Sequence, residues 1–237
     1  MNTRTKTTTR ENRTTLFRWA GVSAMAAGLG FIIVGMFHPV NVPSAVPTAT
    51  WVNVHIVAIA MCFFGLFGMA GLYARQAERS GWLGLAGFVL LSIWMGLVMG
   101  FSFVEAFILP QLAASFPAYV EGFLGMFAGA PSEIDFGILP ALWQISGPMF
   151  IAGPLLFGIA TFRAGILPRG AGALLAASSL LIPVAALVPP EYEAKVVMIP
   201  VGLALAWLGY ALLAERRALA SAISPVGSAG PELSKAA

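Results

Sequence analysis

Hydrophobic residues along this chain gather in long runs that are separated by short polar segments. A helix rises 1.5 Å per residue, so about 20 residues cross the hydrocarbon core of a bilayer. The runs that reach or nearly reach this length cover residues 16–38, 51–73, 82–108, 139–162, 171–188 and 196–213. The pattern predicts an all-α integral membrane protein, built as a six-transmembrane-helix bundle over residues 16–217.

The two ends of the chain differ from the rest in being polar. Residues 1–15 are basic and rich in threonine, and we expect a disordered cytoplasmic tail there. Residues 218–237 are rich in small polar residues and predict a second flexible cytoplasmic tail. The apolar stretch of residues 16–38 is longer than the 7–15 residues of a cleaved leader, so we interpret it as a membrane span.

A further periodic segment lies between the third and fourth predicted spans. Its large apolar residues recur at helical spacing and would form one face of a helix. They are Phe116, Tyr119, Val120, Phe123, Leu124 and Phe127. We expect an amphipathic helix that lies on the outer leaflet or covers the bundle.

Composition excludes most soluble classes of protein. Of 237 residues, 59% are hydrophobic and 10% are charged, which is too few charges for a soluble surface. The net charge of +3 does not indicate nucleic-acid binding, because the basic residues stand in short loops and tails beside apolar runs. The expected partner is the lipid bilayer, with a second copy or another membrane protein left open.

The positions of these charges predict how the spans are oriented. Twelve of the 13 basic residues fall on one side of the six-span arrangement, and the other side has only Lys195. By the positive-inside rule the basic side, with both termini, is cytoplasmic. Arginine greatly outnumbers lysine and alanine is abundant, as in GC-rich bacteria, so the expected location is a bacterial plasma membrane.

Polar residues within the spans are candidates for function, because lipid penalises unsatisfied polar groups. His38 ends the first span, and His55 lies one turn inside Trp51, which we expect at the outer interface. Glu105 lies near the outer end of the third span, and Gln144 opens the fourth. These four residues share one depth in the outer half and form a candidate ligand or cofactor site.

Three interpretations of these four residues stay open. Imidazole and carboxylate groups suit a transition metal, and two histidines suit a haem iron. The same groups can carry protons, as in a small proton-coupled transporter. The third interpretation is hydrogen-bonded packing in an accessory or structural subunit that binds no ligand.

Enzyme motifs are missing from the sequence. There is no G-x-x-x-x-G-K phosphate-binding loop and no G-x-S-x-G nucleophile elbow. The single cysteine, Cys62, has no base near it in sequence and reads as a small apolar side chain. We therefore expect a non-enzymatic protein. For packing within the bundle we expect close contacts at Gly28 with Gly30 and at Gly96 with Gly100.

Several segments resemble small, uncharacterised six-span integral membrane proteins of bacteria. They are MFHPV (36–40), WVNVH (51–55), GLYARQAERSGWLGLAGF (71–88), FVEAFILP (103–110) and FGIATFRAGILPRGAG (157–172). The resemblance is one of pattern over most of residues 16–217. It implies a six-span membrane fold and carries no activity, cofactor or site residue.

Overall fold

The computed structural model describes residues 3–185 and 187–223, and all regular structure within them is helical. In chain order the elements are α1 (Thr3–Phe37), the short 3-10 helix η1 (Pro43–Ala45), α2 (Ala49–Phe107), α3 (Leu109–Leu112), α4 (Pro117–Phe127), α5 (Leu139–Ala164), α6 (Arg169–Ser179), α7 (Ile182–Ala185) and α8 (Pro190–Ile223). Long apolar runs with few helix breakers explain the long elements. The predicted all-helical membrane class thus agrees with the structure.

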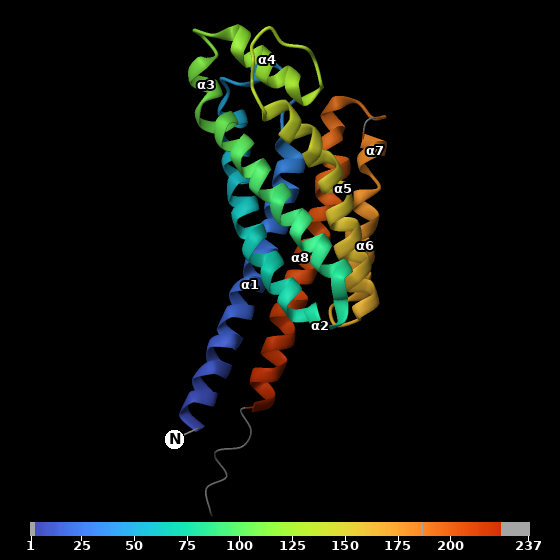
Figure 1. Cartoon of the computed structure of the whole chain (residues 1–237). Coiled ribbons are helices and arrows are strands. Elements are labelled where there is room, and N and C mark those ends of the chain that lie inside the picture. Colours follow the sequence, from blue (N-terminus) through green and yellow to red (C-terminus); the bar gives the residue numbers. More distant parts are fainter. Residues whose placement is uncertain (1–2, 186, 224–237) are drawn as a thin grey trace, which may run out of the picture.

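Element α2 is a folded-back pair of helices. Its residues are helical on both sides of Gly81, which has φ 56° and ψ −156°. A residue with a side chain would be strained at this positive φ, so glycine lets the chain reverse here. Figure 1 shows the two arms, residues 49–80 and 82–107, running in opposite directions. They correspond to the second and third predicted spans.

The fifth predicted span, residues 171–188, is not one continuous helix. Helix α6 ends at Ser179, and α7 covers only Ile182–Ala185. Proline has no backbone N–H, so Pro183 cannot donate to the carbonyl of Ser179, four residues earlier. The side chains of Ser178 and Ser179 bond back to carbonyls of their own helix. The hydropathy of residues 171–188 does not show this break, because hydropathy does not depend on helix continuity.

Four helices are long and apolar enough to cross a membrane among the described residues. They are Thr15–Phe37, Ala49–Leu112, Leu139–Ala164 and Pro190–Ala214. The second of these contains both arms of α2. The structure therefore supports a multi-pass membrane protein, whereas the number of crossings also depends on the broken segment α6–α7.

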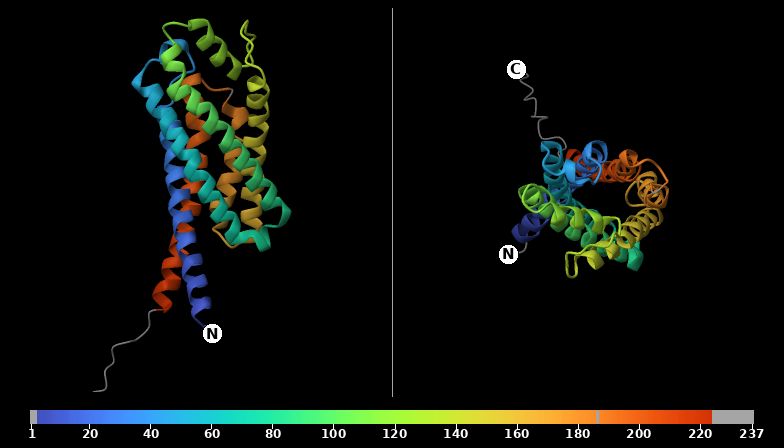
Figure 2. Two further views of the ribbon diagram at one scale, coloured as in Figure 1. Left: turned by 60° about the vertical axis from the view of Figure 1, so that its left-hand side comes forward. Right: turned by 90° about the horizontal axis from the view of Figure 1, so that it is seen from above.

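The helices form a bundle that closes on itself. Neighbouring pairs are α8 with α1, α1 with α2, α2 with α5, α5 with α6, and α6 with α8. Figure 2 shows this arrangement from above. The start of α1, the turn at Gly81, the α5–α6 connection and the end of α8 lie at one end of the bundle (Figure 1), which we call the basic end. Helix α4 lies at the opposite end, the cap end.

Glycines bring helix backbones into contact along α1. A Cβ atom on Gly28 would lie 2.5 Å from the carbonyl oxygen of Gly202 in α8, and one on Gly30 would lie 2.7 Å from the Cβ of Met61 in α2. The expected close packing at Gly28 and Gly30 is confirmed. The expectation for Gly96 and Gly100 is wrong, because nothing lies within 4 Å of either Cβ position. Both are exposed, on the face of their helix opposite the core.

The polar tails also differ from expectation. Helix α1 begins at Thr3, so residues 3–15 continue the helix where a disordered tail was predicted. Extending an existing helix by one residue is far easier than nucleating a new one, and the packed part of α1 supplies the nucleus. Helix α8 likewise continues to Ile223, into the predicted flexible tail. The rest of that tail lies outside the described residues.

Helix α4 confirms the predicted helix near residues 116–127 and closes the cap end. Its buried residues are Val120, Phe123, Leu124 and Met126, and they pack with Trp51 and Phe101 of α2. Phe116, which we expected on the buried face, precedes the helix and is exposed. The helix therefore covers the bundle with most of its predicted apolar face.

Candidate functional site

The first turn of α2 positions two of the side chains at the cap end. Thr48 caps the helix, since its hydroxyl oxygen accepts a hydrogen bond from the backbone N–H of Trp51 (3.2 Å). Residues four apart share one face of a helix, so Trp51 and His55 point the same way. Both side chains are buried, and His55 is 2% exposed.

The fold at Gly81 brings Glu105 of the second arm against His55 of the first. His55 Nε2 lies 3.3 Å from Glu105 Oε2, and Glu105 is 6% exposed. The structure thus joins the two residues that shared a depth in the sequence. The contact has the distance of an ion pair but not the geometry of a hydrogen bond, so His55 Nε2 has no hydrogen-bond partner.

Trp51 organises this pair through three contacts. Its indole N–H donates to the backbone carbonyl oxygen of Glu105 (2.8 Å). Its own carbonyl oxygen lies 2.7 Å from His55 Nδ1, and its ring centroid lies 4.4 Å from that of His55. Trp51 was expected at the outer membrane interface, and its side chain does not face the lipid. It is fully buried, because α4 packs over this part of α2.

His38 stands beside the pair, just beyond the candidate span Thr15–Phe37. Its ring centroid lies 5.1 Å from that of His55, in an edge contact with planes 72° apart. Its Nδ1 lies 2.7 Å from the carbonyl oxygen of Pro39. Burial lowers the pKa of His38 below its ordinary value, the nearby His55 lowers it further, and Glu105 opposes both.

Backbone carbonyls fix the proton positions on both imidazoles. A carbonyl oxygen only accepts, so the Nδ1 of His55 and that of His38 must each carry a hydrogen. A neutral ring then presents a lone pair at Nε2. In His55 that nitrogen lies 3.3 Å from Glu105 Oε2, so one proton can be held by either group.

A proton shared between His55 and Glu105 is therefore the chemistry that these positions allow most directly. With the proton on His55 the two groups form an imidazolium–carboxylate pair. With the proton on Glu105 they form a neutral imidazole–carboxylic acid pair. Both states have no net charge, which lowers the cost of placing them inside a bundle.

No family model matches this chain, and no curated protein or solved structure matches it either.

The metal and haem interpretations gain no support from these positions. Among the described residues, no group of three His, Cys, Asp or Glu side chains is arranged to hold a metal ion. Axial histidines on opposite sides of a haem iron need ring centroids about 6 Å apart, given metal–nitrogen bonds of about 2 Å. The 5.1 Å edge contact between His38 and His55 leaves no such space.

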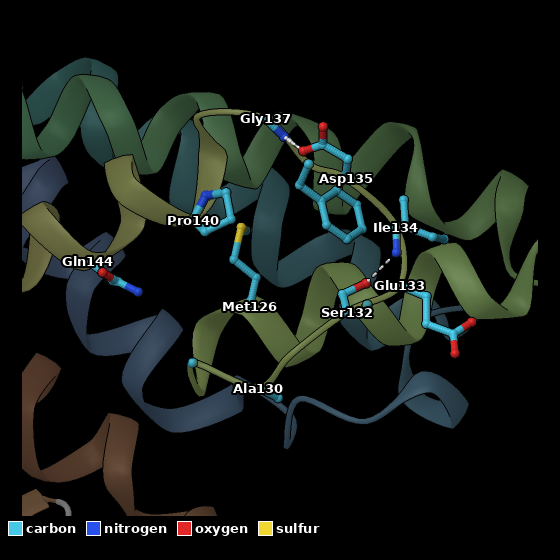
Figure 3. Close-up of a pocket in the computed structure, with 12 residues that line it drawn as sticks. Met126, Ala130, Ser132, Glu133, Ile134, Asp135, Gly137, Pro140 and Gln144 are labelled. Carbon is cyan, nitrogen blue, oxygen red and sulfur yellow. Dashed lines mark hydrogen bonds between the residues drawn. The ribbon is translucent and has the colours of Figure 1, made fainter.

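Gln144 does not join the cluster. It is exposed and lines a separate pocket of about 370 Å³ between α4, the following loop and the start of α5. Figure 3 shows Gln144 at one edge of this pocket, at the far side from Glu133. The sequence placed Gln144 at the correct end of the bundle, but the rotation of α5 turns this side chain outward.

A second buried polar pair, which the sequence did not single out, lies nearer the basic end. Gln76 of α2 donates from Nε2 to Thr161 Oγ1 of α5 (2.8 Å), and the Thr161 hydroxyl donates to the carbonyl oxygen of Phe157 (2.8 Å). Gln76 and Thr161 are at most 1% exposed. Gln76 Oε1 has no hydrogen-bond partner. Gln76 is next to the arginine-rich turn in sequence, where polar residues are commonly exposed, so only the fold reveals its burial.

Proposed function

We propose that the protein is a six-span, non-enzymatic membrane protein that binds a small ligand at the cap end of its bundle. His55 and Glu105 would form the proton-carrying part of that site, Trp51 would position them, and His38 would stand next to them. The observation that carries the proposal is the 3.3 Å contact between His55 Nε2 and Glu105 Oε2, with both side chains buried.

Six crossings require both arms of α2 and the broken segment α6–α7 to count as spans. Figure 1 supports this count, since α6 packs on α5 and α8 and the chain continues through α7, which packs on α8, toward the cap end. The chain reversals at Gly81 and between α5 and α6 lie at the end with the exposed arginines Arg79, Arg163 and Arg169. The positive-inside rule then favours a cytoplasmic basic end in a bacterial plasma membrane.

Energetics favour a binding role for the pair over packing alone. Burying two ionisable groups costs several kcal/mol of desolvation, which their attraction offsets only when every polar atom is satisfied. Here His55 Nε2 is left without a hydrogen bond. The Gln76–Thr161 pair joins two helices with neutral side chains and needs no ionisable group. A pair retained only for packing would be served better by such neutral residues.

Tryptophan emission as a function of pH tests the proton-carrying part of the proposal. Protonation of His55 should alter the emission of Trp51, because an imidazolium cation interacts with the indole π system at this distance. We expect the emission of purified protein in detergent to change reversibly when the pair gains or loses a proton. His55→Leu should remove that change, and Trp51→Phe should remove the same spectral component.

Thr161→Val is the matched control, since it alters a buried polar pair away from the site. It should keep the pH-dependent emission. If the emission of wild-type protein and of His55→Leu changed identically with pH, the pair would not carry a proton and the packing interpretation would replace the proposal.

Reporter fusions test the six crossings separately. Fusions after Arg79, Arg169 and Arg217 should report the cytoplasm, and fusions after Pro47, Ser132 and Glu191 the opposite side. Identical signals at Arg169 and Glu191 would show that α6–α7 does not cross, which would reduce the number of spans.

A further inference from the structure

A shallow pocket of about 550 Å³ lies at the basic end, where α5 turns into α6. It is lined by residues 165–169 and by Ala211 of α8. The turn depends on Gly165, which ends α5 with φ 62° in the left-handed region. The first turn of α6 packs closely on α8, since a Cβ on Gly170 would lie 2.8 Å from the Trp207 ring. The α5–α6 connection, the first residue of α6 and one residue of α8 thus form the walls of this pocket.

Arg169 supplies the charge in this pocket. Its guanidinium carbon lies 6.0 Å from the centre of the Phe162 ring, and its nitrogens lie beside Gly165. Among the side chains that the structure describes, no carboxylate lies within ion-pair distance of Arg169. The cation is therefore held over an aromatic ring and is available to an anion.

The pocket lies at the depth of lipid headgroups if α5 crosses the membrane. The 26 residues of α5 extend about 39 Å, which exceeds the roughly 30 Å hydrocarbon core. Its last residues therefore reach the headgroup layer. Large aromatic side chains are exposed around this end, as expected at a membrane–water interface: Phe162, Trp207 and Tyr210.

We propose that this pocket binds the headgroup of an anionic phospholipid, with Arg169 on the phosphate and the acyl chains against the aromatic surface of α5 and α8. The inference rests on the proposed membrane crossings but not on the His55–Glu105 site. An arginine guanidinium can donate two parallel hydrogen bonds to phosphate oxygens. Basic pockets between helices on the cytoplasmic side bind the headgroups of anionic lipids. The exposed apolar rim favours a lipid over a soluble anion.

Native mass spectrometry of protein from nanodiscs provides the test. Nanodiscs would contain phosphatidylcholine with 30% phosphatidylglycerol, and the retained lipids would be counted after mild release. We expect wild-type protein to retain phosphatidylglycerol at least tenfold in excess of its share. Arg169→Gln should abolish that excess. Arg79→Gln removes an equal charge from the exposed turn of α2 and should preserve it.

Each alternative outcome overturns the proposal in a distinct way. Equal retention of the two lipids by wild-type protein would mean no headgroup selectivity. An equal loss in Arg169→Gln and Arg79→Gln would mean a diffuse charge effect. Displacement of phosphatidylglycerol by millimolar inorganic phosphate would indicate a site for a free anion. Failure to enter nanodiscs at all would instead contradict the proposed membrane crossings.

Discussion

Two buried polar pairs occur along the first arm of α2, and they differ in how their polar atoms are satisfied inside the bundle. Near the basic end, Gln76 bonds to Thr161, and the chain of hydrogen bonds ends on a backbone carbonyl. Near the cap end, His55 meets Glu105 at 3.3 Å without completing a hydrogen bond. Each pair brings α2 into contact with another helical segment. Only the second pair contains ionisable groups.

This difference distinguishes a polar pair that only joins helices from a polar pair that is a candidate for function. A neutral amide–hydroxyl pair joins helices at little desolvation cost, and its bonds do not depend on pH. An imidazole–carboxylate pair is costly to bury and is sensitive to protons. The unsatisfied atom of the first pair is an amide oxygen, whereas that of the second is a titratable ring nitrogen. Chemistry is therefore expected at the cap end.

The largest effect should come from Glu105→Leu. It leaves the buried His55 without a partner, so we expect a loss of about 3 kcal/mol in the free energy of unfolding. Denaturation by SDS in mixed micelles would measure this loss. Glu105→Gln provides the control, because an amide can donate to His55 Nε2 and should recover most of the stability. If Glu105→Leu left the free energy of unfolding unchanged, the His55–Glu105 pair would not contribute to stability. The contrast between the two buried pairs would then be weakened.

A smaller effect is expected at the other pair. Thr161→Val keeps the shape but leaves Gln76 Nε2 without an acceptor, which should cost about 1–2 kcal/mol. Gln76→Leu should be nearly neutral, since Thr161 keeps its bond to Phe157 and the unsatisfied Oε1 disappears. The same denaturation assay, repeated at pH 5 and pH 8, should give equal losses. A strong pH dependence here would break the distinction between the two pairs.

The smallest effect concerns His38 and acid. The pKa of His38 is lowered in the folded protein from its ordinary value of 6.5. As the pH falls through 6.5, His38 is therefore protonated in the unfolded chain before it is protonated in the folded protein. The stability from His38 is therefore present above pH 6.5 and is lost as the pH falls below it. We expect His38→Gln to flatten the decline of thermal stability between pH 6.5 and pH 5. An unchanged decline would assign the acid sensitivity to other groups.

Local patterns were sufficient to predict the helical class, most helix positions and the depth of the site residues. The runs at 139–162 and 196–213 lie within α5 and α8, and residues 116–127 contain α4. These features depend on hydropathy, helical period and helix breakers, which act within one or two turns. The same reasoning placed His55 and Glu105 at one depth, because depth follows from distance along each helix.

Rotation about each helix axis was decided only by the tertiary structure. Gly28 meets Gly202, whereas Gly96 and Gly100 face outward, although all are glycines in apolar helices. Gln144 turns away from the cluster and Gln76 turns inward. Trp51 is buried because α4 folds over it, so its role depends on a segment far along the chain. The face of a helix that is buried depends on which other helices pack against it. The pattern of residue types along the sequence does not specify those packing partners.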